Sequence, residues 1–202
     1  MNRHTPPLLL AAATVLLAAC ASAPMHYYTL LPSAVVGSPN STAALAFEVL
    51  PVSVPAQVDQ PQLVVREGGQ SVALLDGERW IAPLAEEVRG ALAADLAREL
   101  PGRDVGGMSP VSKPVLQVRL DLRRFDSQPA SYALIAGVWS VRLEHDGQHQ
   151  SLACNSRIRE SVGPGYDALV QGHQRALGEL AAQIATVGRA LASGHDASCP
   201  GG

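Results

Sequence analysis

The sequence predicts an α+β fold, a single domain in which a mainly antiparallel β-sheet packs against two long α-helices. Three observations support this class. Short segments rich in strand-forming residues alternate with turn residues in the first half of the chain. Residues 84–100 and 170–191 carry apolar residues at helical spacing. Residues 116–123 alternate apolar and polar side chains, which is typical of a strand with one buried face. The expected order is therefore four strands, a helix, three strands and a helix.

Four strands are expected before the first helix, in segments dense in Tyr, Val, Leu and Thr. Residues 33–44 are rich in Ser, Gly, Pro and Asn, which predicts a surface loop between the first two strands. Gly68-Gly69 is expected to turn the chain between the third and fourth strands, and Asp76-Gly77 to turn it again. The expected strands lie within residues 26–31, 45–54, 58–66 and 70–75.

The first helix is expected to begin at Pro83, where a missing amide hydrogen costs nothing, and to end at Pro101-Gly102. Residues 102–114 then form a flexible connection, in which 107–111 loosely resembles a nucleophile elbow without its second glycine. One side of the helix is apolar and the other is charged. The apolar side comprises Leu84, Ala85, Val88, Leu92, Leu96 and Leu100, and the charged residues expected to lie away from it are Glu86, Glu87, Arg89 and Arg98.

Residues 131–145 predict a long strand that ends in the two-residue turn Asp146-Gly147. Pairing residue 145 with residue 148 sets the register of the strand that follows, and it brings the apolar residues of both strands to one face. Cys154 then lies inside, beside a tryptophan. The expected pairs are Leu143 with Gln150, Val141 with Leu152, Trp139 with Cys154, Ile135 with Ile158, and Glu144 with His149.

The second helix follows Gly163-Pro164-Gly165, with Asp167 as its expected N-cap. It ends at Ser193-Gly194, and residues 195–202 form a flexible C-terminal tail. Its apolar residues recur at spacings of three and four, which predicts a continuous stripe laid against the sheet. Within this stripe, a histidine is expected to be buried and hydrogen-bonded to the sheet rather than to act as a base. The stripe comprises Val170, His173, Leu177, Leu180, Ile184, Val187 and Leu191.

An export signal precedes the domain. Residues 1–19 combine one cation, a short apolar run and small residues, which are the features of a secretory signal peptide. The apolar run is shorter than the roughly 20 residues that a spanning helix needs. The signal runs into Leu17-Ala18-Ala19-Cys20, which resembles the lipobox of bacterial lipoproteins. The alternative is an ordinary secretory signal that ends at a small-residue site, with Cys20 incidental.

The lipobox implies that the chain is cut before Cys20 and that this cysteine carries acyl chains such as palmitate. Two or more such chains hold a protein stably on a membrane. Residues 20–25 then form the lipid anchor and a short tether. Position 21 is Ala rather than Asp, which by resemblance to enteric lipoproteins favours the outer membrane. The folded domain, residues 26–194, is expected on the periplasmic face of that membrane.

The composition argues against several function classes. The net charge is −3, Lys113 is the only lysine, and no basic patch points to nucleic acid. The sequence holds no Walker A, His-Glu-x-x-His or Cys-x-x-Cys motif, so neither a nucleotide site nor a metal site is expected. The covalent lipid on Cys20 is the only expected non-protein group. No enzymatic activity is expected, because no nucleophile has a convincing base.

Two further residue groups carry open alternatives. Cys154 and Cys199 lie in the exported part of the chain, where an oxidising compartment permits a disulfide. Against it, the strand register buries Cys154, and a buried free cysteine packs as a small hydrophobic residue. Trp80, Tyr27 and Tyr28 either form a contact surface for a partner or cap the core at the ends of strands and helices.

Three local sequences, in this order and spacing, resemble the ABC-type transport auxiliary lipoproteins of the PqiC/YmbA kind. They are residues 27–30, 59–66 and 79–84, and the resemblance spans the chain from Tyr27 to about Leu191. The sequence departs from the usual pattern at Gln60, where a basic residue is common, and at Ile81.

This family implies a non-catalytic periplasmic domain tethered to the outer membrane. It works beside an ABC permease, its ATPase and an MCE-domain protein in lipid transport between the two membranes, and self-association would suit such a role. The alternative is a structural or assembly lipoprotein of the cell envelope that binds peptidoglycan or an outer-membrane protein. An envelope hydrolase is disfavoured.

Overall fold

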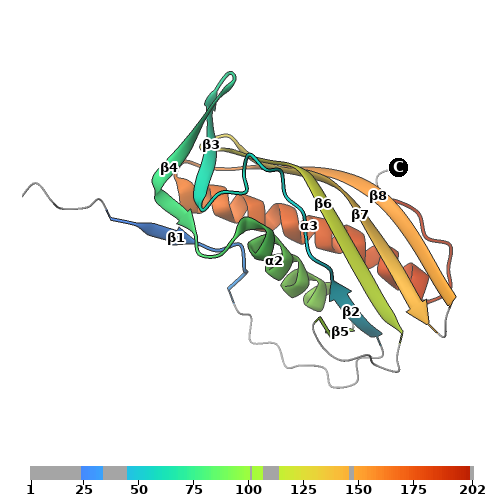
Figure 1. Cartoon of the computed structure of the whole chain (residues 1–202). Coiled ribbons are helices and arrows are strands. Elements are labelled where there is room, and N and C mark those ends of the chain that lie inside the picture. The colour runs from blue at the N-terminus through green and yellow to red at the C-terminus, as the bar shows by residue number, and fades with distance from the viewer. Residues whose placement is uncertain (1–23, 34–44, 101, 107–113, 146–147, 201–202) are drawn as a thin grey trace, which may run out of the picture.

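The computed structural model describes residues 24–33, 45–100, 102–106, 114–145 and 148–200 (Figure 1). The lipobox, the segment 107–111 and the expected turn at 146–147 lie outside the described residues. The elements, in chain order, are β1 (His26–Tyr28), β2 (Leu45–Val49), β3 (Gln62–Gly68), β4 (Ser71–Trp80), α2 (Leu84–Glu99), β5 (Gly102–Asp104), β6 (Val115–Gln128), β7 (Tyr132–His145), β8 (Gln148–Ser161) and α3 (Tyr166–Ala192).

The main sheet has five strands in the order β5-β2-β6-β7-β8. Strands β6, β7 and β8 are antiparallel neighbours, whereas β2 runs parallel to both β5 and β6. The expected hairpin register is confirmed along its whole length, including Trp139 opposite Cys154 and Glu144 opposite His149. The α+β class is also confirmed, with one addition. Part of the expected flexible connection, Gly102–Asp104, forms the short strand β5.

Strand β6 continues five residues beyond its expected end at residue 123 because a β-bulge lies between Leu122 and Arg124. The bulge restores the alternation, so that Phe125 returns to the core. It sits opposite Gly137, where a Cβ atom would approach the carbonyl oxygen of Asp121 to 2.5 Å. A residue with a side chain would therefore push the two strands apart at this point.

Both helices cover one face of the main sheet (Figure 1). α3 packs along β7 and β8, and α2 packs against α3 and β2. All residues of the stripe expected on the second helix are buried, which confirms its position against the sheet. Two expectations are wrong. Gly165, not Asp167, is the N-cap of α3, and Glu87 is buried on α2 instead of pointing into solvent.

A second sheet of three strands, in the order β1-β4-β3, stands at one end of the molecule (Figure 1). Strands β3 and β4 form an antiparallel hairpin that turns at Gly68 and Gly69, both of which have positive φ, as the glycine pair predicts. The second expected turn, at 76–77, is wrong, because these residues lie inside β4. Strand β1 pairs parallel to the last residues of β4.

Candidate functional site

Strand β1 is the first element of the described fold, and the segment that follows it is hydrogen-bonded to both helices. The carboxylate of Glu87 accepts hydrogen bonds from the Thr29 hydroxyl and the Leu30 amide, each at 2.7 Å. From the other side, the amide group of Gln174 on α3 donates to the carbonyl oxygens of Thr29 and Leu31. Leu30 itself is fully buried. The segment after β1 is therefore joined to both helices.

β1 is also joined to its neighbour β4 through side chains. The Tyr28 hydroxyl donates to Glu78 at 2.6 Å, and His26 Nδ1 lies 3.0 Å from the other oxygen of the same carboxylate. Burial acts to raise the pKa of Glu78, but these two hydrogen bonds outweigh it and lower that pKa. Burial and the neighbouring Glu78 raise the pKa of the Tyr28 hydroxyl. The phenol therefore remains a hydrogen-bond donor, which stabilises the β1–β4 pair.

The three aromatic residues expected at a partner contact have different environments. Trp80 is only 6% exposed, and its ring meets Phe125 edge-on with the centroids 6.1 Å apart. Of the two alternatives left open for Trp80, its burial supports the core cap, because packing against Phe125 at the sheet junction holds it in the core. Tyr28 is half-buried, whereas Tyr27 is 58% exposed. Tyr27 is the member of the three that can meet another surface.

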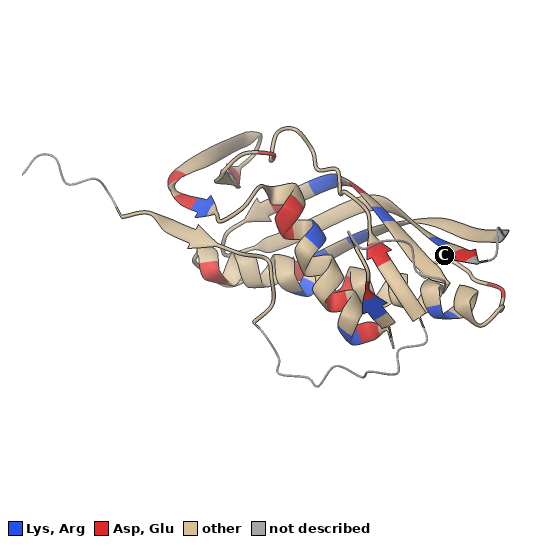
Figure 2. Cartoon of the chain, turned by 60° about the horizontal axis from the view of Figure 1, so that its bottom comes forward, with Lys and Arg blue, Asp and Glu red and all other residues tan. Residues whose placement is uncertain are grey.

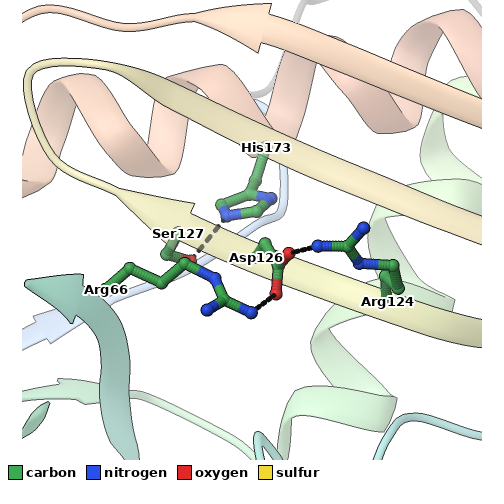
Figure 3. A network of polar contacts seen from close by, with 5 residues as sticks. All are labelled: Arg66, Arg124, Asp126, Ser127 and His173. Carbon is green, nitrogen blue, oxygen red and sulfur yellow. Dashed lines mark hydrogen bonds and ion pairs between the residues drawn. The ribbon is translucent and has the colours of Figure 1, made fainter. Parts of the chain in front are cut away.

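A polar network joins β3, β6 and α3 where the two sheets meet (Figure 3). The Asp126 carboxylate is held between Arg66, at 3.2 Å, and Arg124. The next residue, Ser127, has its hydroxyl 2.8 Å from Nε2 of His173. The extension of β6 beyond the bulge brings these polar residues together. Ser127 lies past residue 123, where the apolar–polar alternation of the sequence ends, so the sequence pattern did not indicate it.

His173 is buried and hydrogen-bonded to the sheet, as expected. Its ring stacks on Phe125 with the centroids 3.9 Å apart and the planes 9° from parallel. Burial lowers the pKa of His173 to about 3, although the nearby charge of Asp126 acts to raise it. The imidazole is therefore neutral at physiological pH, and as a base it is far too weak to activate a hydroxyl group.

A serine beside a histidine invites comparison with a catalytic triad, but the third partner has a different position. In a triad, a carboxylate orients the histidine through its Nδ1 atom. Here Nδ1 of His173 has no hydrogen-bond partner within the described residues, and Asp126 is paired with arginines. Ser127 is also buried. The arrangement ties α3 to β6 and does not present a nucleophile to a substrate.

The structure joins Cys154 on β8 to Cys199 in the C-terminal tail through a disulfide, with their Cα atoms 5.6 Å apart. Cys154 lies on the buried face opposite Trp139. The bridge lets a tail without regular secondary structure return from the end of α3 to the sheet. Within the described residues, no group of three or more His, Cys, Asp or Glu side chains could hold a metal ion.

The face of the main sheet that the helices leave uncovered is rich in arginine. The hairpin register puts its exposed residues in cross-strand rows, with Val138 near the centre at 44% exposed. Arg159 lies over the ring of Tyr132, 3.9 Å from its centroid. We call this surface the arginine face. Its basic residues on β6, β7 and β8 are Arg119, Arg123, Arg124, Arg142, Arg157 and Arg159, and its acidic residues on these strands are Asp121, Asp126 and Glu144.

Outside the arginine face, the basic and acidic residues of the described part of the chain are mixed with one another (Figure 2). Neither helix in the described part of the chain has the length and apolarity needed to cross a membrane. The described residues thus offer a disulfide-tied core and an uncovered, arginine-bearing sheet face.

Solved structures share this fold. An uncharacterized protein is 23% identical, with a TM-score of 0.57 over 81% of this chain and 97% of that one. A DUF330-family protein from Xanthomonas campestris is 18% identical, with a TM-score of 0.51 over 84% and 96% of the two chains. No protein of curated function matches the sequence. The family model for the ABC-type transport auxiliary lipoprotein component matches residues 28–185, from β1 to well inside α3. The chain therefore belongs to the family of ABC-type transport auxiliary lipoprotein components.

Proposed function

We propose that this protein is a non-catalytic accessory component of an MCE-type ABC system for lipid transport between membranes. It is anchored to the periplasmic face of the outer membrane by lipid on Cys20. The family match over residues 28–185 carries this proposal. The lipobox, and Ala at position 21, support the anchor and its membrane. The buried, neutral His173 and its paired neighbours support a binding role over a hydrolytic one.

We assign the contact with the MCE-domain partner to the arginine face. Arginine is enriched at the centres of protein interfaces, and an uncovered sheet face can lie against a broad partner surface. The face carries an excess of positive charge although the whole chain has a net charge of −3. A partner with an acidic surface would therefore be both attracted and oriented here.

The test is co-purification of the lipidated protein from its own cells in mild detergent after cross-linking, with partners identified by mass spectrometry. We expect wild type to capture an MCE-domain protein. Replacing Arg119 and Arg157 by Ser should reduce this capture at least several-fold. The control replaces Arg89, an exposed arginine that pairs with Glu86 on α2, and should leave capture unchanged.

Two outcomes would contradict the proposal. If wild type captures peptidoglycan or an outer-membrane protein but no MCE-domain protein, the structural role in the envelope takes its place. If the Arg119 and Arg157 variant captures the MCE-domain protein as well as wild type does, the arginine face is not the contact.

A further inference from the structure

We infer that a second surface, formed by Met25, Tyr27 and Ile81, seats this end of the domain in the headgroup region of the bilayer that holds its anchor. We call this surface the anchor face. The inference goes beyond partner binding, but it rests on the lipid at Cys20 that the proposed function includes.

The anchor face follows from the pairing of β1 with β4. Tyr27 lies opposite Arg79, and Tyr28 lies opposite Trp80. Because alternate residues of a strand point to opposite faces, Tyr28 and Trp80 share the inward side while Tyr27 and Arg79 share the outward side. Burial agrees, since Trp80 is in the core and the Tyr28 hydroxyl is bonded to Glu78.

Three outward positions along this edge are apolar, where a surface strand normally carries polar residues. Met25 is 42% exposed, Tyr27 is 58% exposed and Ile81 is 61% exposed. Ile81 is attached directly to this edge, because its amide donates to the carbonyl oxygen of Tyr28. A single exposed apolar side chain needs no explanation, but a group of them at one edge marks an interaction site.

Arg79, which also lies on the outward side, suits the surface of a membrane. Arg79 lies beside Tyr27, and a long arginine stem can lie along apolar surface while its charged end reaches water or phosphate. Tyrosine is enriched at membrane–water interfaces, where its ring is in apolar surroundings and its hydroxyl is hydrated. β1 itself carries no Lys, Arg, Asp or Glu and projects from the body of the molecule (Figure 2).

The length of the tether identifies the bilayer as the occupant of this face. Five residue steps separate Cys20 from Met25, and a fully extended chain spans at most about 3.6 Å per residue, so this reach is below roughly 20 Å. The hydrogen bonds from Thr29 and Leu30 to Glu87 limit any lengthening of the tether, because the chain stays fixed at Thr29 even if β1 separates from β4. A lipid on Cys20 therefore keeps this apolar edge beside the membrane, where it is closer to the bilayer than to any soluble partner.

The experiment measures membrane depth with an added tryptophan in the full, lipidated protein, reconstituted in phosphatidylcholine vesicles. The variants are Ile81→Trp and Tyr27→Trp on the anchor face. The control is Val138→Trp, an exposed apolar position on the arginine face. The native Trp80 and Trp139 are buried and supply a constant background, which is measured in wild type.

We expect brominated phosphatidylcholine to quench the added emission of Ile81→Trp and Tyr27→Trp and to shift its maximum to shorter wavelength. Val138→Trp should show neither change. Circular dichroism identifies a variant that fails to fold, and the second anchor-face position then serves in its place.

Equal quenching at all three positions, or none at Ile81 and Tyr27, would overturn the inference. The vesicles contain no other protein, so this outcome is independent of whether the MCE-domain protein is captured from cells. If quenching is normal but the MCE-domain protein is not captured from cells, the proposed partner is wrong and the inferred contact with the bilayer stands.

Discussion

Glu87 Oε2 lies 2.7 Å from the backbone nitrogen of Leu30, a residue 57 positions earlier in the chain. The same oxygen accepts the hydroxyl hydrogen bond of Thr29. One buried carboxylate on α2 thus satisfies two donors in the segment that follows β1. This bond is the reason that a charged residue occupies the core side of an otherwise apolar helix stripe.

Replacing Glu87 by Ala should destabilise the protein by about 2–4 kcal/mol, because the buried Leu30 amide and the partly buried Thr29 hydroxyl both lose a carboxylate acceptor. The measurement is urea unfolding of a chain that begins at Ala21. The matched control is Glu86→Ala, which removes an exposed ion pair with Arg89 and should cost less than about 1 kcal/mol. If Glu87→Ala and Glu86→Ala lower the free energy of unfolding equally, the hydrogen bonds of Glu87 contribute no more than a surface ion pair.

His173 should make stability fall in mild acid. Because burial lowers its pKa to about 3 from 6.5, the unfolded chain takes up a proton near pH 6.5 that the folded protein excludes. Its contribution is complete above pH 6.5 and declines as the pH falls toward 3. Between pH 6.5 and 4.5 the loss from this group should be about 2 kcal/mol, at roughly 1.4 kcal/mol per pH unit.

Urea unfolding of the chain beginning at Ala21, at pH 7.5 and pH 4.5, measures this loss. His173→Gln should be less stable than wild type at pH 7.5 but should lose less stability on acidification. An unchanged pH dependence in His173→Gln would assign the acid sensitivity to other groups.

The chain beginning at Ala21 should contain no free thiol when it is denatured without reductant, because Cys154 and Cys199 are bonded. Two free thiols in that assay would exclude the bridge. The bridge closes a loop with a sequence separation of 45, so reduction should lower the free energy of unfolding by about 2–4 kcal/mol. Cys199→Ser should reproduce this loss and should be insensitive to reductant.

Cys20 should be the site of lipid attachment. Cells that express the wild-type protein and are grown with radioactive palmitate should incorporate the label into it. The Cys20→Ser substitution should abolish this labelling. Because the lipid on Cys20 is the proposed membrane anchor, the unlabelled variant should also leave the membrane fraction on alkaline extraction. Equal labelling of both proteins would reject the lipobox interpretation.

Several features of this protein could be predicted from the sequence because they depend on neighbours along the chain. The stripe from Val170 to Leu191 follows from helical periodicity alone. The register that pairs Trp139 with Cys154 follows from one short turn and from period-two alternation. The buried, hydrogen-bonded state of His173 follows from its place in that stripe.

Other features were decided only by tertiary structure, because they join residues far apart in sequence. Neither the parallel pairing of β1 with β4 nor the separation of the strands into two sheets leaves a local pattern. The burial of Trp80 depends on Phe125, which reaches it only after the bulge in β6.

The same reason explains Glu87, whose local pattern indicated an exposed residue. A carboxylate is excluded from a core unless its hydrogen bonds are satisfied there, and its donors arrive from a segment 57 residues earlier in the chain. Periodicity along the sequence thus determined which faces are apolar. The contacts between distant segments decided which polar groups could be buried within them.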